Sequence, residues 1–425
     1  MTRGRVFRKA LATAALVAVV GVASFSALKP SMVSAGTTSE KGLHIYRISG
    51  DQFGVFTAIH VVTFSGSGYA VKIDLAHHAI DGGVETPSSM CRSTAGCVAA
   101  VNGDFFDVTR RGKPDPGDEV GGIIQNCVLL HTPEVAHQQA NLDGQSVSEG
   151  LNWSSTVDVN GTSVPITAIN QELPMSYVKV NLPLAGTLLF TPPYALRTPS
   201  AIGRVTYEFT QVNGSTTPTT TSTTTPSTTS TTIPTTTSTT ATTTTSTTTP
   251  TTFNPTSPTT INATVVLELV AQTARAVRVT AGRVDISAPT GTVLATLQVG
   301  STVTMTTTST AGCDNIGGHP ILLNHGVVMP IDHADTHMFK QYARTVIGWT
   351  GSGETVLMTV DGKDGVSGAT AHQLVRLLES LNVVTALDLD GGNSTTLFAN
   401  GRVQNIPSSG HERPVSTSLL VVHNP

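Results

Sequence analysis

Val384-Thr-Ala-Leu-Asp-Leu-Asp-Gly-Gly-Asn-Ser-Thr-Thr-Leu397 joins a strand pattern to an abrupt glycine break. β-Branched and alternating residues predict a strand that ends at Gly391-Gly392. Side chains two apart share a strand face at about 6.6 Å, so Asp388 and Asp390 should point the same way, with the leucines beside them in the core. Two carboxylates before glycines and hydroxyls indicate a site. An ordinary turn after a solvated aspartate explains this stretch equally well.

A strand and a helix directly precede this stretch. Thr355-Val-Leu-Met-Thr-Val-Asp-Gly362 predicts a strand that ends in Asp361. Ser367 or Thr370 can cap the helix that follows, in which leucines recur at helical spacing. If the two strands run parallel in one sheet, this order brings Asp361 and Asp390 to one rim.

Short β-like runs fill most of the remaining chain. Residues 43–75 alternate as an antiparallel pair with one wet face would. Cys97-Val-Ala-Ala-Val-Asn-Gly-Asp-Phe-Phe106 leads a buried strand into Asn102-Gly103-Asp104, which places polar side chains at a strand end, although Asn-Gly is also the commonest hairpin dipeptide. We expect an α+β fold of β-rich mixed sheets with a few helices.

Composition bears on the class of ligand. Of the 425 residues only 12% are charged, and the net charge is -4. This composition gives no excess of positive charge that would attract nucleic acid or an anionic membrane. An anionic ligand would need a local group of arginines.

Residues 1–35 are typical of a secretory signal peptide. A basic start precedes an apolar run, and Val33-Ser34-Ala35 offers small residues for cleavage. The apolar run is long, so an uncleaved N-terminal anchor is the alternative. No other stretch is apolar enough to span a bilayer. We expect a protein that is secreted or held at the cell surface.

Four cysteines suit an oxidising compartment and allow three disulfide pairings. Cys91–Cys97 is the preferred local pair, which leaves Cys127–Cys313 to join distant segments. The spacing of cysteines and histidines does not fit a zinc site.

Residues 214–260 are almost wholly Thr, Ser and Pro. A tract with so little to bury cannot offset the entropy of ordering its backbone, so it should be disordered. Its composition is that of an O-glycosylated spacer.

Several motifs together resemble the phosphodiester glycosidase family, and they follow the family's order from about residue 95 to the end. The early motif is Ala99-Ala-Val-Asn-Gly-Asp-Phe-Phe106. The later ones are Gly318-His-Pro-Ile-Leu-Leu, Ala343-Arg-Thr-Val-Ile-Gly348, Val360-Asp-Gly362, Ser367-Gly-Ala-Thr370, Leu387-Asp-Leu-Asp-Gly-Gly392 with Ser394-Thr-Thr396, and Glu412-Arg-Pro-Val415.

The resemblance also implies the domain organisation. Family-like segments lie on both sides of the Thr-rich tract, so residues 36–213 and 261–425 should be two parts of one domain, and residues 214–260 a loop insertion. Loops tolerate long insertions because closure entropy grows slowly with length. Asn393 stands where the family usually has a third glycine, and it opens a glycosylation sequon whose sugar would block the site.

What the resemblance implies chemically is hydrolysis of the glycosidic C–O bond of a sugar phosphodiester, in cell-surface or extracellular glycans. A carboxylate must stabilise the oxocarbenium ion while water or a carboxylate attacks the anomeric carbon. The phosphate is already a good leaving group and calls for planar cationic donors. The expected catalytic residues are Asp390, as stabiliser or nucleophile, and Asp388, Asp361 or Asp104 as base.

The expected substrate-binding residues fall into two groups. Arg344 and Arg413 would bind the phosphate, whereas Asn102 and Ser394 would bind sugar hydroxyls beside the Gly391-Gly392 turn. For each arginine, a buried ion pair with one of the aspartates is the alternative.

Two other functions stay open. The chain could be a non-catalytic polysaccharide or cell-wall binding protein, or a hydrolase that cuts at phosphorus. No cofactor or catalytic metal is expected, although clustered carboxylates would also suit a structural divalent cation. The expected partner is a carbohydrate or a sugar phosphate.

Overall fold

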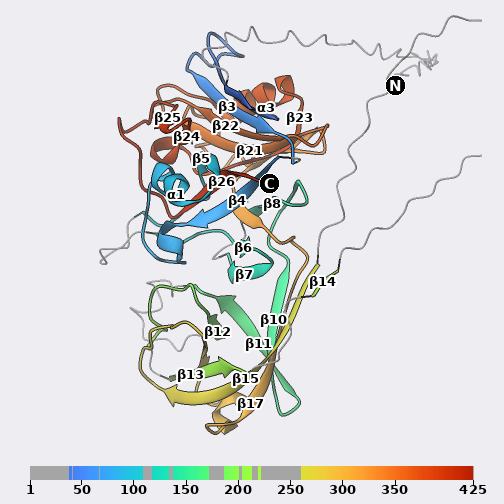
Figure 1. Cartoon of the computed structure of the whole chain (residues 1–425), viewed down its shortest axis with the longest axis vertical. Coiled ribbons are helices and arrows are strands. Elements are labelled where there is room, and N and C mark those ends of the chain that lie inside the picture. The colour runs from blue at the N-terminus through green and yellow to red at the C-terminus, as the bar shows by residue number, and fades with distance from the viewer. Residues whose placement is uncertain are drawn as a thin grey trace, which may run out of the picture.

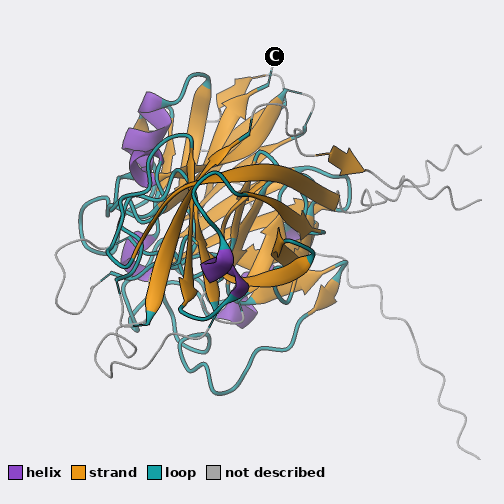
Figure 2. Cartoon of the chain, turned by 90° about the horizontal axis from the view of Figure 1, so that it is seen from below, coloured by secondary structure: helices purple, strands orange, loops and turns teal. Residues whose placement is uncertain are grey.

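A computed structural model of the chain describes residues 38–40, 42–66, 68–108, 117–133, 137–171, 186–200, 203–212, 219–221 and 260–424. The expected signal peptide and most of the Thr-rich tract lie outside these residues. The described part is built mainly from strands, with two α-helices, α1 (Pro87–Ser93) and α3 (Ala371–Ser380). The expected β-rich α+β fold is confirmed, and Figure 2 shows how few of its elements are helical.

An eight-stranded sheet, here called the central sheet, carries the helix α3. Its order is β1-β2-β3-β22-β21-β23-β19-β20. In chain order its strands are β1 (Thr38–Glu40), β2 (Leu43–Ile48), β3 (Ile59–Phe64), β19 (Ile321–Asn324), β20 (Val327–Val328), β21 (Arg344–Thr350), β22 (Thr355–Val360) and β23 (Val383–Asp388). Both β22 and β23 pair antiparallel with β21. These two strands therefore run in the same direction, which meets the condition that the sequence left open, and their C-terminal ends reach the same edge.

The helix α3 begins where the sequence indicates. Thr370 accepts a hydrogen bond from Gln373 N at 3.3 Å, and Gln373 Oε1 accepts one from Thr370 N at 2.9 Å. This capping box satisfies two helix-end donors. The helix buries Leu374, Leu377 and Leu378 against one face of the central sheet.

A second sheet packs on the other face of the central sheet, in the order β25-β24-β5-β26-β4. Its strands are β4 (Tyr69–Leu75), β5 (Cys97–Asn102), β24 (Leu397–Ala399), β25 (Arg402–Val403) and β26 (Thr417–His423). A five-stranded sheet of order β7-β6-β18-β8-β9 adjoins them, built from β6 (Ile123–Gln125), β7 (Val128–His131), β8 (Gln138–Asn141), β9 (Ser146–Ser148) and β18 (Asn315–Gly318). One apolar core joins all three sheets.

The fourth sheet closes into a ring that forms the lower part of the molecule (Figure 1). Its order is β13-β16-β12-β11-β10-β17-β15-β14, and β13 also pairs with β15. The strands are β10 (Trp153–Val159), β11 (Thr162–Ile169), β12 (Thr187–Phe190), β13 (Arg204–Gln211), β14 (Thr219–Thr221), β15 (Thr260–Thr273), β16 (Arg283–Pro289) and β17 (Thr302–Ser309). Apolar side chains of the ring form a core that also includes Ile124 and Leu129 of the five-stranded sheet.

The Thr-rich tract starts and ends in this ring. Antiparallel β13 and β15 flank it, with Gln211 opposite Leu267. Thr221 of β14 pairs with Thr260 of β15, so the chain returns beside the point at which it left.

Three short 3-10 helices complete the described regular structure: Ala76–His78, Val293–Thr296 and Gly392–Ser394. The preferred disulfides Cys91–Cys97 and Cys127–Cys313 are both present. The second bond joins the start of β7 to the segment before β18, 186 residues later. No helix in the described part of the chain has the length and apolarity needed to cross a bilayer.

Candidate functional site

Asp388 ends β23 on the face that α3 covers, and its side chain is fully buried. Its backbone is fixed on both sides, because its N–H donates to Pro320 O at 3.0 Å and its carbonyl accepts from His319 N at 2.8 Å. Within the described residues, Asp388 Oδ1 has no hydrogen-bond partner, whereas Oδ2 accepts from Arg344 Nη1 at 3.1 Å. The strand-end carboxylate predicted from the sequence is therefore buried in an ion pair.

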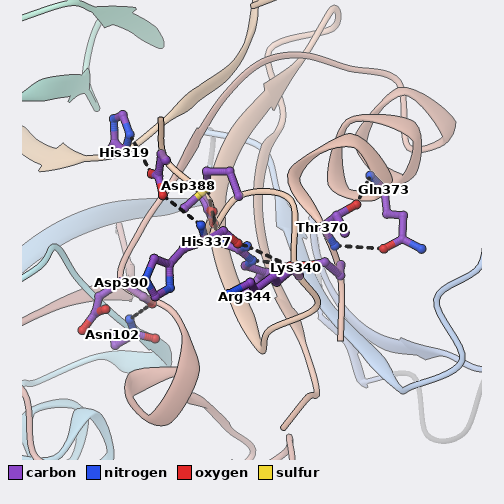
Figure 3. A network of polar contacts seen from close by, with 12 residues as sticks. Asn102, His319, His337, Lys340, Arg344, Thr370, Gln373, Asp388 and Asp390 are labelled. Atoms are coloured by element: carbon purple, nitrogen blue, oxygen red, sulfur yellow. Dashed lines mark hydrogen bonds and ion pairs between the residues drawn. The ribbon is translucent and has the colours of Figure 1, made fainter. Parts of the chain in front are cut away.

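Arg344 uses all five of its N–H donors in this pair and in contacts with nearby loops (Figure 3). Nε donates to Ala369 O at 3.1 Å, and Nη2 to the carbonyls of His337 and Lys340 at 2.9 and 3.4 Å. Nη1 also contacts Met338 Sδ at 3.4 Å, and the residue is 4% exposed. Of the two roles that the sequence left open, Arg344 has the contacts of the buried ion pair.

Burial raises the pKa of Asp388 to about 7, although the Arg344 guanidinium acts in the opposite direction. The charges of Asp390 and Asp335 add to the upward shift in pKa. Desolvation penalises the charged form of a carboxyl, and a nearby cation favours it.

Asp390 follows two residues later and is only partly buried. Burial raises its pKa to about 6, against a hydrogen bond from the Ser394 side chain and the charge of Arg413, which both lower it. The charge of Asp104 raises the pKa further. Asp390 therefore interacts electrostatically with two other candidate residues, Asp104 and Arg413.

Arg413 contributes that cation from the extended segment before Pro414. Its Nη1 donates to Ser394 Oγ at 3.2 Å, and its guanidinium lies 5.3 Å from the centre of the Phe106 ring. Within the described residues, Ser394 is the one hydrogen-bond acceptor of this partly exposed side chain. Arg413 therefore keeps donors available for an anion, unlike Arg344.

Asn102, at the end of β5, is fully buried and joins three segments. Its Nδ2 donates to Asp390 O at 2.7 Å and to Gly103 O at 3.3 Å. Its Oδ1 accepts from Thr345 Oγ1 at 2.7 Å and from Thr396 N at 3.1 Å. Two donors and two acceptor positions exhaust an amide, so these contacts hold the Asp390 turn in place and leave no atom for a sugar hydroxyl.

Asp104 is 3% exposed, and its Oδ1 lies 2.9 Å from His137 Nε2. Oδ2 has no hydrogen-bond partner within the described residues. A Cβ atom added at Gly121 or at Gly317 would collide with this oxygen. Only glycine at both positions therefore permits the close approach of the backbone to this carboxylate.

Asp361 faces away from Asp388 and Arg344. Val360 belongs to the core under α3, so alternation along β22 places Asp361 on the opposite face of the central sheet from Asp388. Its partners are His60 Nε2 at 3.4 Å and Ile406 N at 3.0 Å. The structure thus gathers Asp390, Ser394 and Arg413 with Asp388, Asp104, Asn102 and Arg344 close behind them, and it places Asp361 at a separate cavity.

The glycine turn is packed tightly against β21. A Cβ atom at Gly391 would lie 2.8 Å from Ala343 O, and Gly392 adopts φ +57° while its N–H donates to the same carbonyl at 2.8 Å. Asn393 is exposed and is not among the positive-φ residues. The asparagine therefore takes the place of the family's glycine without a left-handed backbone.

Sequence reasoning missed the histidines beside two of the carboxylates, His137 and His60, because each comes from a strand or loop remote in sequence. It also missed Ser408, whose Oγ donates to Gly362 O at 2.8 Å and to Gly392 O at 3.1 Å. In Figure 3 the exposed His337 ring projects toward the side of Asp390. None of these residues carries a local motif that would single it out.

Metal ligands do not cluster here. Across the described ranges, no three side chains of His, Cys, Asp or Glu lie close enough together to hold an ion.

Comparisons with known proteins indicate the family. The family described as phosphodiester glycosidase matches residues 235–422. Residues 235–422 therefore carry the match to the phosphodiester glycosidase family. The matched range includes Arg344, Asp388, Asp390 and Arg413, whereas Asn102 and Asp104 precede it. The structure brings these two earlier residues to the matched part.

Curated relatives of the family are similar over a limited stretch. N-acetylglucosamine-1-phosphodiester alpha-N-acetylglucosaminidase of Bos taurus is 36% identical over 90 residues, which are 20% of this chain and 17% of the relative. The Mus musculus protein of that name is 33% identical over 118 residues, 25% of this chain and 23% of the relative. The chain thus aligns with less than a quarter of either relative.

Solved structures share the fold over nearly the whole chain. A hypothetical protein from Synechocystis matches with a TM-score of 0.64 at 16% identity, covering 92% of this chain and 64% of that one. A protein of Burkholderia pseudomallei described as exported matches with a TM-score of 0.57 at 15% identity, covering 92% and 76%. At such identities the likeness concerns the fold alone.

Proposed function

We propose that this protein belongs to the phosphodiester glycosidase family and hydrolyses the glycosidic C–O bond of a sugar phosphodiester in extracellular or cell-surface glycans. The observation that carries the proposal is the shared Ser394 hydroxyl, which contacts both the Asp390 carboxylate and the Arg413 guanidinium. An acid and a cation held together at a partly exposed edge suit a substrate that is both a sugar and an anion.

Asp390 faces the developing positive charge in this mechanism. In its ionised form it stabilises the oxocarbenium ion or attacks the anomeric carbon directly. Ser394 fixes the orientation of the carboxylate, and Asn102 fixes the backbone that carries it.

Arg413 binds the phosphate through the guanidinium donors that Ser394 leaves free. The departing phosphate is a weak base, so little general-acid assistance is required. Arg344 acts indirectly, because it neutralises the buried Asp388 and anchors three loop carbonyls behind the site.

The base that activates water is assigned to Asp104 with His137. Asp104 has one oxygen without a partner and influences the pKa of Asp390 electrostatically. His137 holds the other oxygen at 2.9 Å. Asp361, whose oxygens are engaged by His60 and by Ile406 N, takes no part in this step.

Export is part of the same proposal. The predicted signal peptide at residues 1–35 and the two disulfides suit an oxidising compartment outside the cytoplasm. Mass spectrometry of the protein recovered from culture medium tests it: a mature N-terminus near residue 36 is expected, and an intact Met1 in a membrane fraction would identify an anchor instead.

Hydrolysis in ¹⁸O-labelled water tests the reaction. Aryl and nucleotide-linked sugar phosphates serve as substrates, and C–O cleavage places the label on the sugar. Label on phosphate would identify attack at phosphorus, and the absence of any product would favour a binding protein.

Variants then assign the residues. Asp390→Asn and Arg413→Ala should each lower kcat/KM by more than about tenfold, with unchanged circular dichroism. Arg275→Ala, at an exposed arginine of the ring, is the matched control for removal of one charge. Near-wild-type turnover in both site variants would refute the proposed roles.

A further inference from the structure

A cavity of about 300 Å³ lies between the central sheet and the β24–β25 hairpin. Figure 1 shows this hairpin in the upper part of the molecule. The walls of the cavity come from β2, β3, the end of β22 and the segment that follows β25. The volume is at the lower end of the range for small-ligand sites. Its lining residues are Ile45, Tyr46, Arg47, His60, Asp361, Leu397, Arg402, Gln404 and Ile406.

Three of the polar groups come from one sheet face. Arg47 and His60 are direct cross-strand partners on β2 and β3. Asp361 follows β22 on the same face and contacts the His60 ring at 3.4 Å. Side chains opposite one another on neighbouring strands lie within about 5.5 Å, so these groups form one cluster. Arg402 faces them from β25.

The charges of the cavity favour an anion. Asp361 is 5% exposed, and its oxygens are engaged by Ile406 N and by His60. The side chains of Arg47 and Arg402 are exposed, and within the described residues neither guanidinium has a hydrogen bond or an ion pair. Two unengaged guanidinium groups therefore outweigh one carboxylate whose hydrogen-bonding capacity is already used on the cavity wall. Guanidinium groups bind the oxygens of phosphates and carboxylates in a fork.

The remaining lining suits a sugar ring. Ile406 offers most of the apolar surface, since this residue is 70% exposed, whereas Ile45 and Leu397 form the buried apolar floor. Gln404 adds an amide beside them, which can exchange hydrogen bonds with hydroxyls. Apolar walls with a few polar groups that fix orientation are typical of small-molecule sites.

One loop connects this cavity to the Asp390 site. Gln404 and Ile406 line the cavity, and Ser408, two residues on, donates to Gly392 O at 3.1 Å. Arg413 ends the same segment and contacts Ser394. A ligand that fills the cavity is thus bound by the loop that carries the proposed phosphate-binding arginine.

We propose that this cavity is a second binding site, for an anionic sugar unit charged through a phosphate or a carboxylate. Arg47 and Arg402 bind the charged group, and the apolar wall with Gln404 accepts the ring. The site stands beyond the proposed hydrolysis and does not require it: it gives the protein a second contact with an anionic glycan.

Isothermal titration calorimetry of the full chain tests the proposal with glucose 6-phosphate, glucuronate and glucose. The titrations use an Arg413→Ala background, so that the Asp390 site does not contribute. At least one of the two anionic sugars should bind, and neutral glucose should not. The stronger ligand identifies the charged group. No heat from either anionic sugar at about 10 mM, a concentration far above the usual range for specific sites, would overturn the proposal.

Variants of the cavity decide where such a ligand binds. Arg47→Ala with Arg402→Ala, both at exposed positions, should weaken binding by at least about tenfold, whereas Arg275→Ala on the ring should leave it unchanged. Asp361→Asn keeps an acceptor for Ile406 N and removes a negative charge, so it should tighten binding by about threefold or more. Unchanged affinity in the double variant would overturn the proposal.

Hydrolysis of a small aryl sugar phosphate is measured in the same cavity variants with Arg413 retained. The Arg47→Ala/Arg402→Ala protein should keep kcat/KM within about twofold, because neither arginine belongs to the group of Asp390, Ser394 and Arg413. A protein that binds the anionic sugar but hydrolyses nothing would refute the proposed reaction and leave the second site standing.

Discussion

Arg344 and Arg413 were both expected to bind the phosphate, but their guanidinium groups have different contacts. Arg344 is buried with all five donors engaged, and Arg413 is partly exposed with one acceptor. A buried charge without its partner is strongly destabilising, whereas an exposed one costs little. We therefore expect Arg344 to contribute mainly to the stability of the fold and Arg413 mainly to substrate binding.

Arg344→Met should lower the free energy of unfolding by about 3–5 kcal/mol, because it leaves the Asp388 carboxyl buried without its cation. Arg413→Met should change it by less than about 1 kcal/mol. Urea unfolding followed by tryptophan fluorescence measures both values. Similar losses in the two variants would contradict the division of roles.

The acidity of Asp390 predicts how the rate depends on pH. Burial raises its pKa to about 6, so the carboxylate that the mechanism requires forms only as the pH rises through that value. We expect kcat/KM to rise from pH 5 to pH 7, with an apparent pKa near 6 that belongs to the free enzyme. Ser394→Ala removes a hydrogen bond that lowers the pKa, so it should raise this apparent pKa. If the apparent pKa of the kcat/KM profile does not change in this variant, the titrating group is not Asp390.

At the scale of elements, the antiparallel pairing of β21 with both β22 and β23 sets the site. It places the start of β21, with Arg344, between the ends of the two strands that carry Asp361 and Asp388. The α3 N-terminus completes the arrangement, because Ala369, just before the cap residue Thr370, gives its carbonyl to Arg344 Nε. The sequence indicated the strand pattern and offered Ser367 or Thr370 as the cap, and the structure shows that Thr370 caps the helix with Gln373. Asp361 and Asp388 lie on opposite faces of the central sheet, and the local sequence of each strand does not determine which face its aspartate occupies.

Thr370→Ala should lower the free energy of unfolding by about 1 kcal/mol, since it removes the oxygen that caps Gln373 N. Thr370→Ser keeps that oxygen and is the matched control. Chemical denaturation of the two variants gives the comparison. Equal stability of the alanine and serine variants would show that the capping box contributes nothing in solution.

At the scale of the whole molecule, segments remote in sequence meet repeatedly. Asn102 binds Thr345, Thr396 and the Asp390 carbonyl. The disulfide Cys127–Cys313 joins two segments that are 186 residues apart in sequence, with the ring strands and the Thr-rich tract between them. Because Thr221 pairs with Thr260, the Thr-rich tract can be removed where it leaves the sheet. This supports the proposal that residues 214–260 are an insertion into one domain.

Replacement of residues 222–259 by Asn-Gly should leave the fold intact, because two residues of this type close an antiparallel pair in a tight turn. The free energy of unfolding should stay the same or rise by up to about 2 kcal/mol, as the closed loop becomes much shorter. Thermal melting and hydrolysis measure the outcome. Loss of the cooperative transition would show that the tract separates two domains.

The sequence by itself indicated many of the strands, the helix α3 with two candidate cap residues, the preferred local disulfide Cys91–Cys97, and the motifs that resemble the family. Each depends on local periodicity, a cap residue, cysteine spacing or motif order, which are properties of neighbouring residues. Only the tertiary structure decided that Arg344 is buried with Asp388, that Asn102 holds the turn, and that Asp361 belongs to another cavity with His60. These outcomes depend on which remote strands become neighbours and which face each one buries. Pairing across hundreds of residues fixes both, and no local pattern encodes it.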